Sequence, residues 1–195
     1  MVNHIEGKLT EKTPTYAVVE CNGLGYLLNI SLSTYSKLGT SGNCKLYAQE
    51  MYVRDDLPKL FGFADIPERQ LFRHLVSVSG VGGTSALMML SALSALEIQQ
   101  AILTGNVPVL KSIKGIGEKT AQRIIVDLKG KLGKSELSSD FMVVAHNNNR
   151  EEALSALVNL GFAKNVTEKA LDKVISSSSS ELNVEDIIKA ALKNL

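Results

Sequence analysis

A seven-residue pattern rich in glycine occurs twice in this chain, 35 residues apart, and it constrains the fold more than any other feature. Gly80-Val81-Gly82-Gly83-Thr84-Ser85-Ala86 returns as Gly115-Ile116-Gly117-Glu118-Lys119-Thr120-Ala121. Each copy lies between two stretches whose apolar residues have helical spacing. Because glycine reaches φ angles that other residues avoid, each copy predicts a sharp turn between helices, anchored by Val81 or Ile116.

These predicted turns have the chemistry of a phosphate-binding site. Glycine N–H groups can approach a phosphate closely, and the following helix N-terminus adds free N–H groups and partial positive charge. Lys119 and Arg123 are one helical turn apart, just beyond the second turn. Such a site contacts the DNA backbone rather than base edges, so we predict binding without sequence specificity. The predicted contact residues are Gly80, Gly82, Gly83, Gly115, Gly117, Lys111, Lys114, Lys119 and Arg123.

Other interpretations of the repeat are possible. The turns could serve helix packing alone in a scaffold protein, with Lys119 and Arg123 on an ordinary solvated face. A P-loop is excluded, because no glycine directly precedes Lys119 and the loop is too short. A DNA glycosylase with lyase activity could place its Schiff-base lysine at Lys119, but it needs a nearby catalytic aspartate and often a downstream four-cysteine cluster. Here Cys21 and Cys44 are upstream, and Asp140 is in a predicted linker.

Positive charge is concentrated around the second copy of the repeat. The chain has 21 basic and 20 acidic residues, a net charge of +1. Residues 64–134 contain nine basic against five acidic residues, whereas residues 135–195 contain six against nine. Because affinity for phosphate follows the local potential, the near-neutral total is compatible with nucleic-acid binding.

Residue periodicity divides the chain into four segments and predicts an α+β multidomain protein. Residues 1–64 form short alternating strands with a hairpin turn at Asn22-Gly23, which predicts an OB-like β-barrel. Residues 65–133 predict an all-α domain that contains both turns. Residues 134–148 are predicted to be a linker, because both ends are polar and regular periodicity is lacking. Residues 149–195 predict a unit of three short helices, with a UBA-like arrangement.

Several helix starts are predicted from a capping residue followed three residues later by an acid. Asp65 with Glu68 and Ser94 with Glu97 have the pattern of a capping box. The predicted caps of the last three helices are Asn149, Asn165 and Asn183.

Composition argues against several other classes of protein. Cys21 and Cys44 have no CxxC spacing, so buried reduced thiols are expected rather than a disulfide. The three histidines are scattered, and neither a metal site nor a cofactor is expected. No apolar run approaches the roughly 18 residues that span a bilayer, and the first residues do not resemble a signal peptide. We therefore expect a cytoplasmic protein without a membrane contact.

The order of barrel, paired turns, linker and three-helix unit resembles the RuvA family, the Holliday-junction-binding subunits of the bacterial branch-migration complex. The resemblance covers essentially the whole chain. Besides the two turns, its most specific matches are Ile5-Glu6-Gly7, Gly23-Leu24-Gly25-Tyr26, Val53-Arg54-Asp55-Asp56, Leu60-Phe61-Gly62-Phe63, and Glu68-Arg69 with Leu71-Phe72. Members of this family often have a basic residue where this chain has Thr84, and another where it has Glu118.

The resemblance implies a non-catalytic DNA-binding subunit that acts in recombination, DNA repair and the SOS response. It implies a homotetramer, or an octamer, that holds a four-way junction open and recruits the hexameric ATPase RuvB, with the RuvC resolvase as a further partner. Asp55 and Asp56 would be an acidic pin near the junction centre, since carboxylates repel phosphates. From the residues alone they would be a polar loop. The unit at 149–195 would bind the motor.

Overall fold

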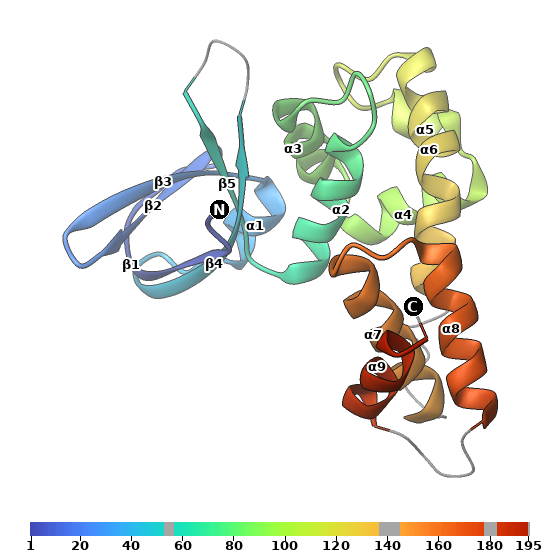
Figure 1. Ribbon diagram of the computed structural model, residues 1–195. Helices are drawn as coiled ribbons and strands as arrows, with labels where there is room; N and C mark the ends of the chain where they lie inside the picture. Colours follow the sequence, from blue (N-terminus) through green and yellow to red (C-terminus); the bar gives the residue numbers. More distant parts are fainter. Residues whose placement is uncertain (53–56, 137–144, 178–182, 195) are drawn as a thin grey trace. The chain divides into compact units, whose positions relative to one another are not determined.

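The computed structural model describes residues 1–52, 57–136, 145–177 and 183–194 (Figure 1). The chain forms two compact units, Met1–Ser138 and Ser139–Leu195, and each is described by itself. The first unit contains a barrel and five helices that pack beside it, and the second contains three helices.

Five strands close into the barrel in the order β1-β2-β3-β5-β4. All neighbours are antiparallel except β3 and β5, which are parallel. The strands are β1 (His4–Lys12), β2 (Tyr16–Cys21), β3 (Leu24–Ile30), β4 (Gly42–Met51) and β5 (Lys59–Phe63). Asn22 and Gly23 both have positive φ in the β2–β3 turn, as the sequence predicts. A short helix that the sequence did not reveal, α1 (Leu32–Lys37), lies between β3 and β4.

Alternation along the strands places one set of side chains inside the barrel. The buried interior includes Ile5, Ala17, Val19, Leu28 and Leu46. The barrel therefore has a core of its own, which gives its outer surface and loops a rigid support.

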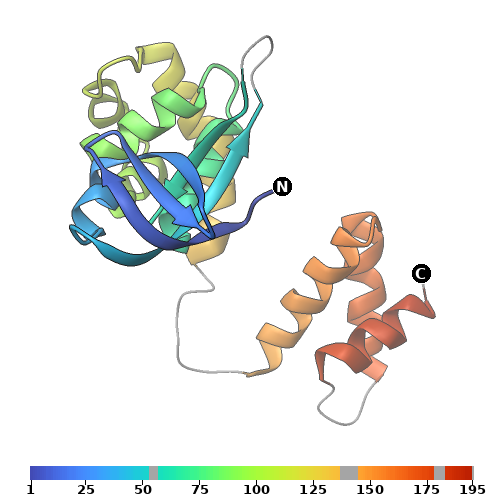
Figure 2. The same cartoon turned by 90° about the vertical axis from the view of Figure 1, so that its left-hand side faces the viewer.

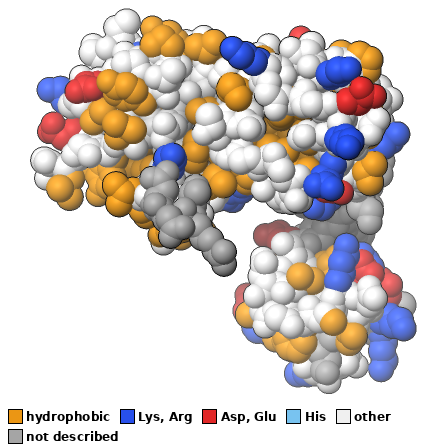
Figure 3. Space-filling view, turned by 90° about the horizontal axis from the view of Figure 1, so that it is seen from above, with side chains coloured by type: hydrophobic (Ala, Val, Ile, Leu, Met, Phe, Trp, Pro, Cys, Tyr) orange, Lys and Arg blue, Asp and Glu red, His pale blue; other side chains and the backbone are white. Residues whose placement is uncertain are grey.

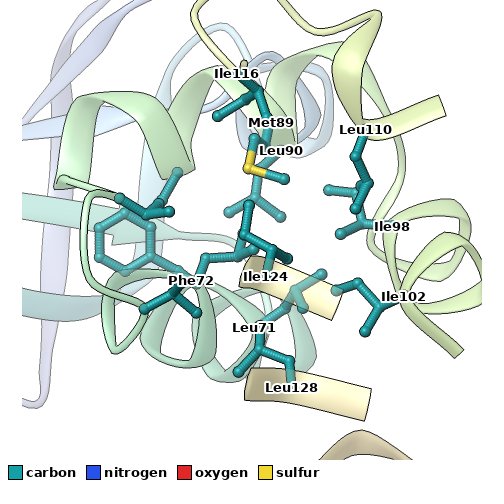
Figure 4. Close-up of a cluster of buried hydrophobic side chains, with 14 of the residues drawn as sticks. Leu71, Phe72, Met89, Leu90, Ile98, Ile102, Leu110, Ile116, Ile124 and Leu128 are labelled. Atoms are coloured by element: carbon teal, nitrogen blue, oxygen red, sulfur yellow. The ribbon is translucent and has the colours of Figure 1, made fainter. Parts of the chain in front are cut away.

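Five helices follow the barrel and share a second core (Figure 4). They are α2 (Ile66–Val76), α3 (Gly83–Ala92), α4 (Ala95–Thr104), α5 (Val107–Lys111) and α6 (Glu118–Glu136). Leu71, Met89, Ile98 and Ile124 come from four of these helices and meet at its centre. The Ser94–Glu97 capping box is present, and α4 ends at Gly105, which is left-handed.

Aromatic side chains join the barrel to α2. The ring centroids of Phe61 and Phe63 in β5 each lie 4.9 Å from the ring centroid of Phe72 in α2. Asp65 caps α2 as predicted, since its side chain accepts the N–H of Glu68.

The expected reciprocal bond from the Glu68 side chain to the cap is replaced by a tertiary contact. That carboxylate is buried and instead accepts hydrogen bonds from Ser31 and Thr34 at the start of α1. Burial raises the pKa of Glu68 above its ordinary value, while these hydroxyl donors act in the opposite direction. The prediction of a full capping box here is therefore wrong.

The second unit consists of α7 (Ala145–Asn159), α8 (Lys164–Ser177) and α9 (Val184–Leu192), drawn in orange to red in Figure 2. Its core includes Leu157, Leu171 and Ile187. Asn183 caps α9, as predicted, and accepts the N–H of Asp186. Asn149 and Asn165 lie inside their helices rather than at the caps, because α7 and α8 begin earlier than the sequence indicates.

The segment 134–148 and the two cysteines differ from what the sequence predicts. Helix α6 continues to Glu136 and α7 begins at Ala145, so both ends of the predicted linker 134–148 are helical, and residues 137–144 lie outside the described part. Cys21 and Cys44 are free thiols but only half-buried. The thiol of Cys21 donates to the carbonyl of Glu6 at 2.9 Å, and burial raises the pKa of Cys44.

No single helix in the described ranges is both long and apolar enough to cross a membrane. Helices α3 and α4 meet those criteria only together, as a pair bent by 101°. Within the same ranges, no three His, Cys, Asp or Glu residues come together in a way that could hold a metal ion.

Candidate nucleic-acid interface

The first glycine-rich segment forms a tight turn between α2 and α3, which we call the first hairpin (residues 77–83). Gly80 has a φ of 91°, a conformation that strains residues with a side chain. The N–H of Val81 donates to the carbonyl of Val78 at 3.0 Å, and the Val81 side chain is buried. Gly82 caps α3, and a side chain there would meet only open space.

The second segment repeats this backbone between α5 and α6 and is called the second hairpin (residues 112–118). Gly115 has a φ of 89°, and the N–H of Ile116 donates to the carbonyl of Ile113 at 3.0 Å. Ile116 is buried, and Gly117 is exposed with open space above it. Each hairpin therefore presents two exposed glycines and a helix N-terminus to solvent, Gly80 and Gly82 in the first and Gly115 and Gly117 in the second. This is a suitable arrangement for binding an anion.

The residue after the capping glycine differs between the hairpins. A Cβ on Gly83 would lie 2.5 Å from Cζ of Phe61 and 3.0 Å from Sδ of Met51. The first hairpin is therefore packed against the barrel, and this close approach requires a glycine. At the matching position the second hairpin has the exposed Glu118, whose carboxylate lies 3.2 Å from Nζ of Lys111.

The predicted basic residues are exposed, but they do not form one group. Lys114 and Lys119 belong to the second hairpin and the start of α6. Lys111 is paired with Glu118, so its charge is partly compensated. Arg123 was expected beside Lys119, yet its guanidinium donates to the carbonyl of Ser79 in the first hairpin at 3.3 Å.

A second contact extends from α3 to the second hairpin. The methyl group of Met88 in α3 lies 3.4 Å from the position that a Cβ of Gly115 would occupy. Met88 and Arg123 are 35 residues apart, as are the two hairpins, so they occupy equivalent positions of the repeat. Each helix that follows a hairpin thus reaches across to the other one. The sequence shows that the two positions are equivalent in the repeat, but it does not show their contacts.

Figure 3 shows the face of the chain that is seen from above Figure 1. Lys and Arg side chains gather over the helical part of the first unit, whereas more hydrophobic side chains cover the barrel. The helical part, which contains both hairpins, therefore has a face on which the charged side chains are mainly basic.

Asp55 and Asp56, the predicted pin, lie outside the described residues. The flanking strands β4 and β5 are described, and their last pair is Met51 with Lys59. Phe61 and Ser79 could not be assigned to the candidate interface from the sequence, because their contacts depend on tertiary packing.

Comparison with protein-family models matches three segments of the chain. Residues 1–62 match the RuvA N terminal domain, residues 72–130 a SAM-like helix-hairpin-helix tandem, and residues 148–195 the RuvA C-terminal domain. Among curated proteins, the chain is 47% identical over 195 residues to the Holliday junction branch migration complex subunit RuvA of Christiangramia forsetii, with both chains covered completely. The chain belongs to the RuvA family.

Two further RuvA proteins show that this similarity extends over the full length. The protein of Flavobacterium psychrophilum is 46% identical over 195 residues, with complete coverage of both chains. That of Cytophaga hutchinsonii is 43% identical over 198 residues, with 99% of each chain covered. Family membership therefore confirms the fold class and the resemblance that the sequence indicated.

Proposed function

We propose that this chain is a DNA-binding subunit of a branch-migration complex and that it binds four-way junctions without sequence specificity. Its relatives are named as Holliday junction branch migration complex subunits. From the family resemblance, we expect the chain to act with a RuvB-type hexameric ATPase and to hold the junction open as a tetramer. The chain itself would contribute binding and geometry, while ATP hydrolysis would be the task of the motor.

The observation that carries this proposal is the duplicated hairpin. Two turns with the same backbone expose glycines and helix N-termini, and Val81 and Ile116 anchor them from below. Two phosphate-binding turns on one rigid unit favour contact with backbone phosphates of a shaped DNA over the reading of base sequence.

We assign Asp55 and Asp56 to the junction centre on the basis of the family resemblance. Paired carboxylates would repel phosphates of a continuous duplex and so favour separated strands. The double change to Asn should preserve junction binding while reducing the preference over duplex. Loss of all binding would contradict a repulsive role.

The second unit is proposed as the motor-binding module. The turn between α7 and α8 and its surroundings expose a group of apolar side chains, which is typical of a protein contact. This group comprises Val158, Leu160, Phe162 and Val166. Changing Leu160 to Ser should abolish stimulation of the motor while leaving junction binding intact. Loss of junction binding instead would argue against the assignment of DNA binding to the first unit and motor binding to the second.

A gel-shift titration with an immobile four-way junction and a linear duplex of the same arms tests the central claim. We expect a clear preference for the junction that is independent of arm sequence. Equal affinity for the two DNAs, or no binding, would favour a scaffold whose hairpins only pack helices.

A further inference from the structure

The guanidinium of Arg123 contacts the first hairpin. Its Nη1 donates to the carbonyl of Ser79, the residue directly before Gly80, at 3.3 Å. A guanidinium has five N–H donors, so this bond leaves others available to a ligand at the same turn. Arg123 is exposed and lies on α6, the helix that begins at the second hairpin.

The first hairpin has no charge of its own. Residues 75–96 contain no Lys, Arg, Asp or Glu, whereas Lys111, Lys114, Glu118 and Lys119 lie in or directly beside the second hairpin. Thr84 is the repeat-matched counterpart of Lys119, and it cannot supply positive charge. Any cation that assists the first hairpin must therefore come from another segment.

We propose that Arg123 is the cation of the first hairpin, and that it binds the phosphate held by Gly80 and Gly82 rather than the one held by the second hairpin. This proposal rests on the proposed DNA-binding function. The bond to Ser79 fixes the guanidinium beside the turn, and its planar fork suits simultaneous contact with a carbonyl and a phosphate. Helix α6 thus serves both hairpins, with Lys119 at one and Arg123 at the other.

This assignment makes the two hairpins dependent on each other. The exchange of side chains places Met88 of α3 at the second hairpin and Arg123 of α6 at the first. The apolar member of the pair contributes packing, and the charged member contributes binding. Loss of Arg123 should weaken phosphate binding at the first hairpin, although the backbone of that hairpin is unchanged.

The test begins with Arg123→Met, which introduces the residue of the matching position, and with Lys119→Met as the control. Each variant should bind the junction about tenfold more weakly, as expected for loss of one charge-assisted hydrogen bond to phosphate. Wild-type protein that fails to bind the junction would overturn the proposed function itself. Weaker binding alone does not test the assignment of Arg123. The test must show at which hairpin Arg123 contributes to DNA binding.

A double-mutant cycle with Thr84→Lys locates that contribution, because this substitution places a charge on the first hairpin. Thr84→Lys should raise affinity more in the Arg123→Met background than in the wild type, since the added lysine replaces a missing cation. In the Lys119→Met background, it should raise affinity by the same factor as in the wild type. Equal gains in all three backgrounds would overturn the proposal.

Single methylphosphonate substitutions along the junction arms provide an independent readout. Removing the charge of one phosphate weakens binding only where that phosphate is contacted. Some methylphosphonate substitutions should weaken the binding of Thr84→Lys more than the binding of wild type. The phosphates at those positions are the ones contacted by the first hairpin. We expect Arg123→Met to lose sensitivity at these positions and Lys119→Met to lose it elsewhere. If both variants lose sensitivity at the same phosphates, Arg123 belongs to the second hairpin.

Discussion

The two hairpins have the same backbone but different surroundings. Gly80 and Gly115 have φ values of 91° and 89°, and the same hydrogen bond closes each turn. Yet the first hairpin lacks charge and is packed against the barrel, while the second is surrounded by charged residues and open to solvent. The comparison shows that glycines and one apolar anchor determine the shape of the turn, whereas neighbouring elements determine its electrostatic character.

The difference is clearest at one pair of matching positions. Gly83 in the first hairpin lies under the ring of Phe61, and Glu118 in the second faces solvent beside Lys111. Seven substitutions at matching positions test whether the hairpins differ in the way that these surroundings imply.

The largest difference should come from Gly83→Ala compared with Glu118→Ala. The new methyl group at residue 83 would collide with the buried Phe61, and overpacking of this kind costs about 1–3 kcal/mol. The change at the exposed residue 118 should alter the free energy of unfolding by less than about 0.5 kcal/mol. Urea denaturation of both variants measures the contrast. Similar costs at the two positions would mean that the barrel contact does not distinguish the hairpins.

Gly80→Ala and Gly115→Ala should instead behave alike. Both positions have positive φ, where an L-residue is disfavoured by about 1–2 kcal/mol. The same denaturation measurement should therefore give nearly equal losses of stability. A cost at only one position would show that the two backbones are less similar than their φ angles indicate.

Lys119→Gln should change the salt dependence of DNA binding, whereas the matching change in the first hairpin should not. Because a lysine that neutralises a phosphate releases counterions, its loss should flatten the slope of log K against log salt by about 1 for each contact. Thr84→Gln, at the matching position of the first hairpin, should leave the slope unchanged. Titrations at several salt concentrations compare the two. An unchanged slope for Lys119→Gln would show that this side chain does not contact phosphate.

Glu118→Gln should have the smallest effect, and it should strengthen binding. The Lys111–Glu118 pair is exposed, and such pairs contribute about 0.2–1 kcal/mol. Releasing Lys111 and removing a negative charge next to the second hairpin should raise junction affinity about two- to fivefold. Weaker binding in the same titration would indicate that the carboxylate positions Lys111 rather than competing with phosphate.

Local patterns in the sequence predicted the features that depend on local chemistry. The turns at Gly80 and Gly115, the capping box of Ser94 with Glu97 and the hairpin at Asn22-Gly23 all follow from neighbouring residues. The barrel and the helical domain were also predictable, because strands and helices have different apolar periods.

The unpredicted contacts join residues far apart in the chain. Phe61 approaches Gly83, Arg123 reaches Ser79, and Glu68 accepts bonds from α1. No local pattern indicates which distant segment will cover a glycine or receive a hydrogen bond, since packing of the whole unit decides it. The sequence alone therefore could not predict that Arg123 lies at the first hairpin.

The contact between Phe61 and Gly83 also bears on mechanical behaviour. Phe61 is part of β5 and its ring packs on Phe72 in α2, so the first hairpin is braced from the barrel and from the preceding helix. If DNA binds at the hairpins as proposed, a pull on a DNA arm at this hairpin would be transmitted into the closed barrel. At the second hairpin, which lies between α5 and α6, the same pull would act on helices. We would therefore expect DNA to be anchored more stiffly at the first hairpin.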